Sequence, residues 1–288
     1  MNINLSPVKE YVQAQNLKLF GFSVMTDEGI HSYEPGNGNP LNNSYSVTKS
    51  YTATAIGMLW EKGLLSLDEP IVDILKGEGI RYQDKNWEKV TVRHALSHKM
   101  GIARGYLDID VEDIYAYGTT DFLEVAFREP LPHAPGDFYR YSDAAYYLLS
   151  RVFAARAKEK MDNFLMRELL VPMRVREAAW SRCPMHYPMG ATGLYIRSSD
   201  MVKLGYLYAN GGIYDGKRLL SEEWIREDQS SQFAFQKAND QGLLGKGGML
   251  GQMLVYSPSG RYAAAWHSYG GDKHAKALTE ILNSIIKE

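Results

Sequence analysis

A serine and a lysine three positions apart begin a helical pattern in the first quarter of the chain. Ser46 ends a polar stretch, and apolar residues then recur at helical spacing, at Ala53, Ile56, Gly57 and Trp60. We therefore expect Ser46 at the N-terminus of a buried helix, with Lys49 one turn along on the same side. A serine nucleophile needs a nearby base, and the unpaired backbone N–H groups of a helix start can stabilise an oxyanion.

The Ser-x-x-Lys pattern alone is weak evidence, because the chain contains it three times. Ser6 is better explained as a helix cap, with Pro7 at the first helical position. Ser284 falls inside an amphipathic C-terminal helix and is expected to face solvent. Only Ser46 follows an extended segment and opens a buried helix, which makes it the candidate nucleophile.

Composition and charge are those of an ordinary globular protein. At 288 residues the chain is long enough for one large domain or two lobes, and 45% of it is hydrophobic. A net charge of −2 gives no reason to expect a nucleic-acid partner. No stretch approaches the ~18 apolar residues of a membrane span, and the N-terminus has no run of signal-peptide length. Because the single cysteine, Cys183, also suits a reducing compartment, we expect a cytoplasmic protein with no membrane partner.

Strand patterns lie at both ends of the chain, and helical patterns fill the middle. Predicted strands cover residues 19–25, 30–33, 192–196, 251–256 and 262–268. Predicted helices cover residues 7–16, 46–63, 91–98, 120–127, 141–160, 162–170 and 198–210. The 198–210 helix has Ser198 or Ser199 as its expected cap. A last helix is expected to bury Ala275, Leu278, Ile281, Leu282 and Ile285.

This order of motifs resembles the serine β-lactamase and penicillin-binding protein superfamily, in the branch of class C β-lactamases, D-amino-acid peptidases and related esterases. Residues 46–49 match its first motif, and residues 91–102 are similar to its segment T-[IV]-R-H-L-L-S-H-T-S-G-[IL]. Residues 141–143 resemble the second motif, Tyr-x-Asn, and residues 246–248 the third, Lys-Thr-Gly. Residues 190–220 resemble the family's glycine-bounded helix and hairpin. The likeness covers nearly the whole chain, in family order.

The resemblance implies an α+β fold, in which an antiparallel sheet built from both chain ends is flanked by helices and faces a helical lobe. We expect a single β-lactamase-like domain over residues 1–288. Its α/β lobe would comprise residues 1–45 and 190–288, its helical lobe residues 46–189, and the active site would lie between them.

The resemblance also implies roles for particular side chains. Ser46 would be the acylated nucleophile, Lys49 the base that takes its proton, and Tyr141 a second proton carrier on the leaving-group side. A lysine can act as a base only if burial and neighbouring cations lower its pKa, and Lys246 would be such a cation. The oxyanion donors would be the backbone N–H groups of Ser46 and Met249.

Two positions depart from the family pattern. Asp143 replaces the usual Asn, and its carboxylate either keeps Lys49 protonated or favours a substrate with an amine, unless it is simply a helix N-terminal acid. Gly247 replaces the usual Thr and removes a hydroxyl that would bind a substrate carboxylate, while Gly247 and Gly248 let a substrate lie close to the strand. Both departures count against efficient β-lactam hydrolysis.

Other candidate sites are weaker. His94 and His98 have the i, i+4 spacing of metal ligands but lack the Glu of His-Glu-x-x-His, so we expect packing and loop hydrogen bonds. His267 is an alternative third motif, but we prefer Lys246 because two strands follow it in order. We expect a solvated loop face rather than a cleft rim for the acidic residues Asp108, Asp110, Glu112 and Asp113.

The sequence thus predicts a serine hydrolase that cleaves an ester or amide of a small-molecule substrate, with no cofactor and no metal. Activity on short activated esters is the activity we most expect. One alternative on the same fold is a penicillin-binding protein or β-lactamase acting on β-lactams. The other is a catalytically inactive binding module, since a fold does not fix a function.

Overall fold

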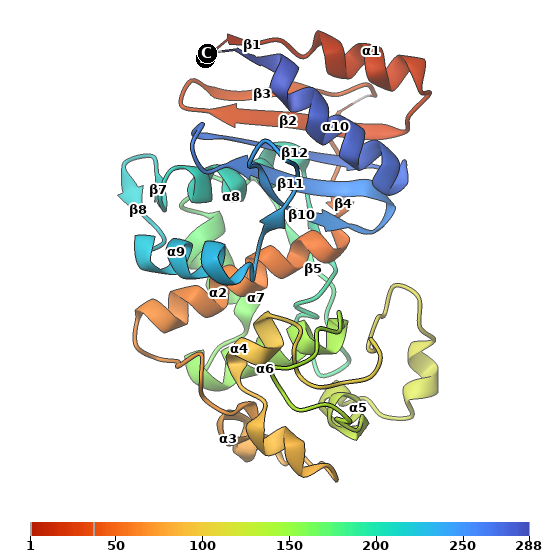
Figure 1. Cartoon of the computed structure of the whole chain (residues 1–288), viewed down its shortest axis with the longest axis vertical. Coiled ribbons are helices and arrows are strands. Elements are labelled where there is room, and N and C mark those ends of the chain that lie inside the picture. Colours follow the sequence, from red (N-terminus) through yellow and green to blue (C-terminus); the bar gives the residue numbers. More distant parts are fainter. Residues whose placement is uncertain (1, 37, 288) are drawn as a thin grey trace.

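Strands from both chain ends pair in one antiparallel sheet (Figure 1). The computed structural model describes residues 2–36 and 38–287, and its main sheet has the order β3-β2-β12-β11-β10-β9. These strands are β2 Leu19–Thr26, β3 Gly29–Tyr33, β9 Gln236–Lys237, β10 Leu244–Gly248, β11 Gln252–Ser257 and β12 Tyr262–Ser268. Strand β12 pairs with β2, so the predicted joining of the two chain ends is confirmed.

Alternation along the strands sends side chains to two different cores. On β12, Ala264 and Trp266 pack in a cluster with α1 (Ser6–Ala14) and α10 (Gly271–Ile285). Their neighbour Ala263 faces the opposite side, where α8 (Ser198–Ala209) lies. Helix α8 approaches closely at Gly205, because a Cβ there would lie 2.9 Å from the Cβ of Ala263. The sheet is therefore covered by helices on both faces.

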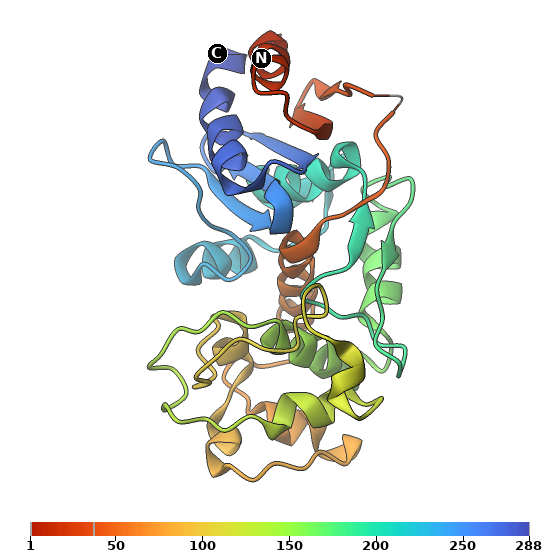
Figure 2. The same ribbon diagram turned by 90° about the vertical axis from the view of Figure 1, so that its right-hand side faces the viewer.

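The middle of the chain is helical and lies below the sheet in Figures 1 and 2, with α2 running between the two parts. Its helices are α2 Thr48–Glu61, α3 Ile71–Leu75, α4 Val92–Leu96, α5 Phe122–Arg128, α6 Asp143–Ala157 and α7 Met161–Leu165. Every residue of α2 from Thr48 to Leu59 is buried, so this helix is enclosed on all sides, as expected for a buried helix. The division into lobes at residues 45 and 190 stays a prediction. Within the described ranges, no helix combines the length and apolar character that a membrane crossing requires.

Short strands hold the segment that leads to the candidate nucleophile. Strands β4 (Asn42–Asn43), β5 (Ala179–Trp180) and β6 (Leu194–Ile196) form a second sheet, in which Asn43 pairs with Tyr195.

The termini also pair, through β1 (Asn2–Ile3) and β13 (Ile286–Lys287). A hairpin forms from β7 (Ile213–Tyr214) and β8 (Lys217–Arg218), and α9 (Glu222–Ser231) follows it. The hairpin was predicted. Helix α9 was not, and neither were the two-residue strands β1, β4, β5, β9 and β13, which are too short to show a period.

Some predicted helix details are wrong. Ser6 does not cap α1: Leu5 holds the cap position, and the N–H of Ser6 donates to the Asn4 side chain. Neither Ser198 nor its neighbour caps α8, because the chain enters that helix one residue earlier and the Ser198 hydroxyl instead bonds Ser23 in the core. In α10, Ile281 is only partly buried, whereas the other four predicted residues are buried.

The contact between α2 and α9 gives a stability prediction. A Cβ on Gly57 would lie 2.2 Å from the indole of Trp224, which is fully buried against α2. We expect Gly57→Ala to lower the free energy of unfolding by about 1–3 kcal/mol, measured by urea denaturation. Gly77→Ala is the matched control, since no atom lies within 4 Å of its added Cβ. Equal stabilities of the two variants would contradict this packing.

Candidate active site

The backbone before α2 is fixed on both sides of a tight turn. Residues Tyr45–Val47 form a 3₁₀ turn that runs directly into α2. Tyr45 has a left-handed φ of 47°, and its N–H donates to the Asn43 side chain at 2.9 Å. The N–H of Ser44 donates to the Leu194 carbonyl on β6 at 2.8 Å. A left-handed conformation at a non-glycine residue persists only where its surroundings hold it, and here they place Ser46 at the helix start.

Three predicted catalytic side chains meet at this turn. The ammonium of Lys49 donates to Ser46 Oγ at 3.1 Å, and the Tyr141 hydroxyl donates to the same oxygen at 2.6 Å. Lys49 Nζ also lies 4.6 Å from the centre of the Tyr141 ring. Lys49 is fully buried, whereas 37% of Tyr141 is exposed. The hydroxyl of Ser46 therefore lies between a buried ammonium and a phenol that solvent can reach.

Asp143 changes the electrostatics of the site. Its Oδ1 lies 2.7 Å from Lys49 Nζ, and the Ala191 carbonyl accepts a further hydrogen bond from that ammonium at 3.0 Å. Burial lowers the pKa of Lys49, but the adjacent charge and hydrogen bond of Asp143 outweigh it, so this pKa is raised above its ordinary value. The lowered pKa that a base at this position requires is thus not found.

The lowered lysine pKa belongs instead to Lys246 on β10. Lys246 is 6% exposed, and its Nζ makes a long hydrogen bond of 3.4 Å to Gln236 Oε1. Burial, assisted by the charge of Lys49, lowers the pKa of Lys246 to about 7. Its ammonium lies 5.5 Å from the centre of the Tyr141 ring, so two lysines of different character approach the same phenol.

Glycine allows β10 to reach the serine turn. A Cβ on Gly248 would lie 2.4 Å from the carbonyl oxygen of Ser44 and 3.3 Å from the nitrogen of Ser46. No other residue would permit this approach, which brings the end of β10 beside the turn that leads into α2. A Cβ on Gly247 would meet nothing closer than 3.6 Å, so the missing threonine side chain leaves open space rather than a filled contact.

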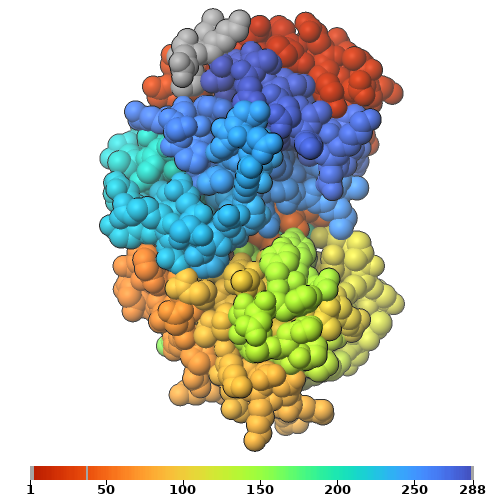
Figure 3. Space-filling model, viewed as in Figure 1, coloured from red at the N-terminus to blue at the C-terminus, as the bar shows by residue number. Residues whose placement is uncertain are grey.

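A cavity of about 510 Å³ opens at this junction. Six predicted site residues line it, namely Ser46, Tyr141, Lys246, Gly247, Gly248 and Met249. Lys49 and Asp143 are buried and are not part of the lining. A hollow is visible between the blue C-terminal part and the yellow to green middle of the chain, with orange atoms at its base (Figure 3).

Two glutamines in the lining were not predicted, Gln236 on β9 and Gln252 on β11. No local motif identifies them, because strand pairing alone brings them to the cavity. Gln252 Oε1 also lies 2.9 Å from Nδ1 of His267. This histidine is completely buried and does not line the cavity. The arrangement therefore supports Lys246 rather than His267 as the residue of the third motif.

Two residues of the acidic loop, Asp108 and Asp110, lie close to Asp143 while keeping part of their surface exposed to solvent. Carboxylate oxygens of Asp108, Asp110 and Asp143 lie within 4.8 Å of one another. Burial raises the pKa of both Asp108 and Asp110, and the charge of Asp143 adds to the effect. Asp143 is already paired with Lys49, and Asp110 accepts a hydrogen bond from Thr192 at 2.5 Å. Because these internal partners account for two of the three groups, we assign no metal to them.

The histidines of the 91–102 segment have structural partners. His94 and Thr91 form a capping box at the start of α4, so this histidine closes a helix end. His98 accepts the backbone N–H of Ser142, and its ring lies 4.5 Å from that of Tyr141. Burial lowers the pKa of His98 well below its ordinary value, so it packs as a neutral ring behind the phenol. The prediction of packing and loop hydrogen bonds is confirmed.

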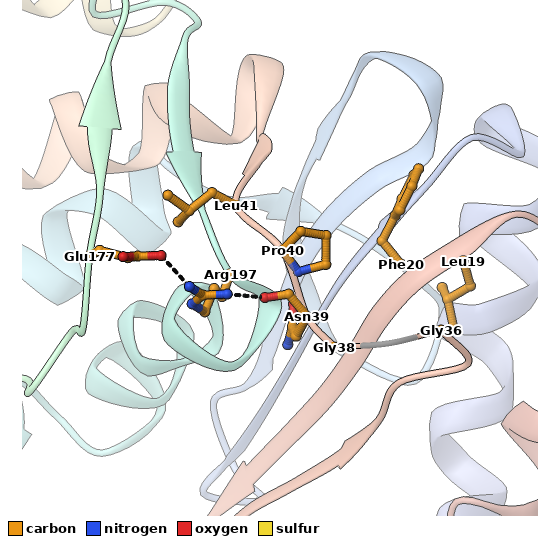
Figure 4. A pocket seen from close by; sticks show the side chains of 9 residues that line it. All are labelled: Leu19, Phe20, Gly36, Gly38, Asn39, Pro40, Leu41, Glu177 and Arg197. Carbon is orange, nitrogen blue, oxygen red and sulfur yellow. Dashed lines mark hydrogen bonds and ion pairs between the residues drawn. The ribbon is translucent and has the colours of Figure 1, made fainter.

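A separate cavity of about 580 Å³ shares no lining residue with the first. It is shown in Figure 4, with Arg197 at one side. Arg197 donates to the carbonyl of Asn39 and pairs with Glu177, so its charge is already compensated within the protein. We assign no chemistry to this second cavity.

The Lys49–Asp143 pair gives a prediction about stability. Asp143→Asn leaves a buried ammonium without its counter-charge, and we expect the free energy of unfolding to fall by about 3–5 kcal/mol. The double variant Lys49→Met/Asp143→Asn should lose much less than the sum of the single changes in urea denaturation.

The pH dependence of this contribution follows from the raised pKa of Lys49. The pair contributes its full stabilisation below pH 10.5, the ordinary pKa of lysine in the unfolded chain. This stabilisation is lost as the pH rises through the higher pKa that Lys49 has in the folded protein. The coupling should therefore be constant between about pH 8 and 9, above the pKa of about 7 of the neighbouring Lys246 and below that of Lys49. Additive single effects would mean that the two side chains do not stabilise each other.

Comparison with known proteins places this geometry in a family. Residues 30–282 match the Beta-lactamase family. Penicillin-binding protein 4* of Bacillus subtilis is 24% identical over 214 residues, which are 73% of this chain and 41% of that protein. The chain spans less than half the length of the curated relatives it matches.

Solved structures with the same fold cover almost the whole chain. A putative 6-aminohexanoate-dimer hydrolase from Bacillus anthracis superposes with a TM-score of 0.81 at 16% identity, over 97% of this chain and 81% of that one. A D-stereospecific amidohydrolase from Streptomyces has a TM-score of 0.73 at 16% identity, over 97% and 99%. At these identities the likeness concerns the fold. Since the family match extends over most of the sequence, the chain belongs to the Beta-lactamase family, within the superfamily of serine hydrolases and penicillin-binding proteins.

Proposed function

We propose that the protein cleaves an ester or amide of a small molecule through an acyl-enzyme on Ser46. One observation carries the proposal: Ser46 Oγ lies within hydrogen-bond distance of both Lys49 and Tyr141, beside a cavity lined by Gly248 and Met249. A serine nucleophile needs proton carriers within reach, as Lys49 and Tyr141 are here, and backbone N–H donors for the oxyanion, a role we assign to Ser46 and Met249.

In the proposed reaction Ser46 Oγ attacks the substrate carbonyl carbon. The hydroxyl proton passes to Lys49 in its neutral form, and the N–H groups of Ser46 and Met249 receive the negative charge that develops on the carbonyl oxygen. The bond to the leaving group then breaks, and that group takes a proton from Tyr141. In the second half of the reaction water attacks the acyl carbon and gives a proton to the Tyr141 phenolate. The bond to Ser46 Oγ then breaks, Lys49 returns its proton to that oxygen, and the acid is released.

Amides and esters suit this site better than β-lactams. Two structural neighbours carry names that denote amide cleavage, a 6-aminohexanoate-dimer hydrolase and a D-stereospecific amidohydrolase. Gly247 offers no hydroxyl for the carboxylate of a β-lactam, and Asp143 adds negative charge behind Ser46. Penicillin binding remains the second candidate function, because a penicillin-binding protein aligns with 73% of the chain.

An active-site label tests the nucleophile. We expect a fluorophosphonate to add its mass to wild-type protein at Ser46, located by peptide mass spectrometry, because the neighbouring groups raise the reactivity of this hydroxyl. Ser46→Ala should abolish the adduct. Ser6→Ala and Ser284→Ala should retain it and are matched controls, since each removes the serine of another Ser-x-x-Lys sequence.

The outcomes separate the candidate functions. Wild-type protein that takes no label would favour the inactive binding module. A lasting penicillin adduct without nitrocefin turnover would favour a penicillin-binding protein. Rates on nitrophenyl esters and aminoacyl amides then define the substrate class, and acyl groups with an amine should react faster than those with a carboxylate because Asp108 and Asp110 adjoin Asp143.

The charge of Asp143 should limit the reaction. Asparagine carries no charge, so the effect of burial, which lowers the pKa of Lys49, would be opposed by Tyr141 but no longer by a carboxylate. We expect Asp143→Asn to move the rising limb of the pH–rate profile for nitrophenyl acetate down by about one to three pH units, and to speed acylation at pH 7.

Asp162→Asn is the matched control for this experiment. Asp162 is also a buried acid in an ion pair, with Arg182, but it does not line the Ser46 cavity. The pH–rate profile of Asp162→Asn should have its rising limb at the same pH as that of the wild-type protein. Slower acylation by Asp143→Asn, with the fold intact, would mean that Asp143 assists catalysis by taking the proton of Lys49.

A further inference from the structure

The side chain of Gln252 is tied to the turn that carries the predicted oxyanion donor. Gln252 is 1% exposed and lies at the start of β11, directly after the Met249–Gly251 turn. Its amide nitrogen donates to the Met249 carbonyl at 3.2 Å and to the Ser268 carbonyl at 2.7 Å. One side chain thus joins the turn to the end of β12.

The amide has only one orientation that satisfies its neighbours. Gln252 Oε1 accepts the backbone N–H of Ser268 at 3.3 Å and lies 2.9 Å from Nδ1 of His267. Burial lowers the pKa of His267 to about 4, so at neutral pH its ring is uncharged and can donate from Nδ1. If the oxygen and nitrogen of the amide were exchanged, the NH₂ group would face the N–H donors of Ser268 and His267, and the amide oxygen would face the carbonyls of Met249 and Ser268. The neighbours therefore fix which end of the amide faces Met249.

The turn needs such support because its backbone is strained. Leu250 has a left-handed φ of 66°, which a non-glycine residue adopts rarely, and its side chain is 40% exposed and adds little packing. Gly251 follows at φ 97°, where a Cβ would lie 3.0 Å from Ser268 Oγ. Strained residues of this kind persist only when their surroundings determine them.

We propose that Gln252 is a positioning residue, which holds the Met249–Gly251 turn so that the Met249 N–H faces the developing oxyanion at Ser46. This inference rests on the proposed function and names a residue beyond its catalytic groups. The N–H and C=O of Met249 belong to two planar peptide units joined at one Cα. Fixing the C=O by the Gln252 amide therefore restricts the direction of the N–H, while Gly248 holds the same strand against the Ser44 carbonyl.

The test compares two substitutions that remove different parts of the amide. Gln252→Met is close in length and loses every hydrogen bond of the side chain. Gln252→Glu keeps the acceptor for Ser268 and His267 but, when ionised, no longer donates to the Met249 carbonyl. Gln229→Met is the matched control, because Gln229 donates to Tyr256 at 3.2 Å and does not line the cavity.

Both Gln252 variants should lose about 100-fold in kcat for nitrophenyl acetate, with KM changed by less than about threefold, because a misplaced oxyanion donor affects mainly the transition state. The affinity for phenylboronic acid, which forms a tetrahedral adduct with serine, should fall with kcat/KM. We expect the loss of kcat to be of similar size in Gln252→Met and Gln252→Glu, even if the two variants differ in melting temperature. Gln229→Met should keep the wild-type kcat.

The outcomes separate this inference from the proposed function. If the fluorophosphonate does not mark wild-type Ser46, the proposed function fails and this inference fails with it. If wild-type protein is marked and turns over ester, but folded Gln252 variants keep the wild-type kcat, only the positioning role is overturned. A kcat that follows the melting temperature across all three variants would overturn it as well, because it would indicate a purely structural role.

Discussion

A buried ion pair between α2 and α6 sets the electrostatics of the whole site. Lys49 is fully enclosed, Asp143 is 5% exposed, and 2.7 Å separates their charged atoms. An ammonium in this position would be strongly unfavourable without a counter-charge. The Ala191 carbonyl and Ser46 Oγ accept its remaining hydrogen bonds, so the same group that stabilises the helix pair also orients the serine hydroxyl.

The pair also explains why the two lysines of the site differ. Lys49 and Lys246 both lie near the Tyr141 ring, at 4.6 and 5.5 Å from its centre. Asp143 compensates the first, whose pKa is raised, whereas the second has only a long contact with Gln236 and its pKa falls to about 7. Near neutral pH the phenol therefore lies between one permanent charge and one that titrates.

The features that were predictable from sequence depend on local spacing or on the order of motifs. The start of α2 follows from the polar stretch before Ser46 and the apolar period after it, and the pairing of β12 with β2 follows from the family order. The direction of the Lys49 pKa stayed open in the sequence, because it depends on the separation from Asp143, 94 positions away. Gln252 was missed for a similar reason, since its pairing with Gly248 and a turn without a motif bring it to the cavity.

The approach of Gly248 to the serine turn has a consequence for how such a protein can diverge. Because a glycine meets the carbonyl of Ser44, strand β10 and the turn that leads into α2 abut main chain to main chain at this point. The spacing of these two elements therefore does not depend on which side chains line the cavity around them. Related proteins can carry different lining residues, and so bind different molecules, while the backbone contact at the junction stays the same. Such tolerance is compatible with a neighbour that superposes at a TM-score of 0.81 although only 16% of the residues are identical.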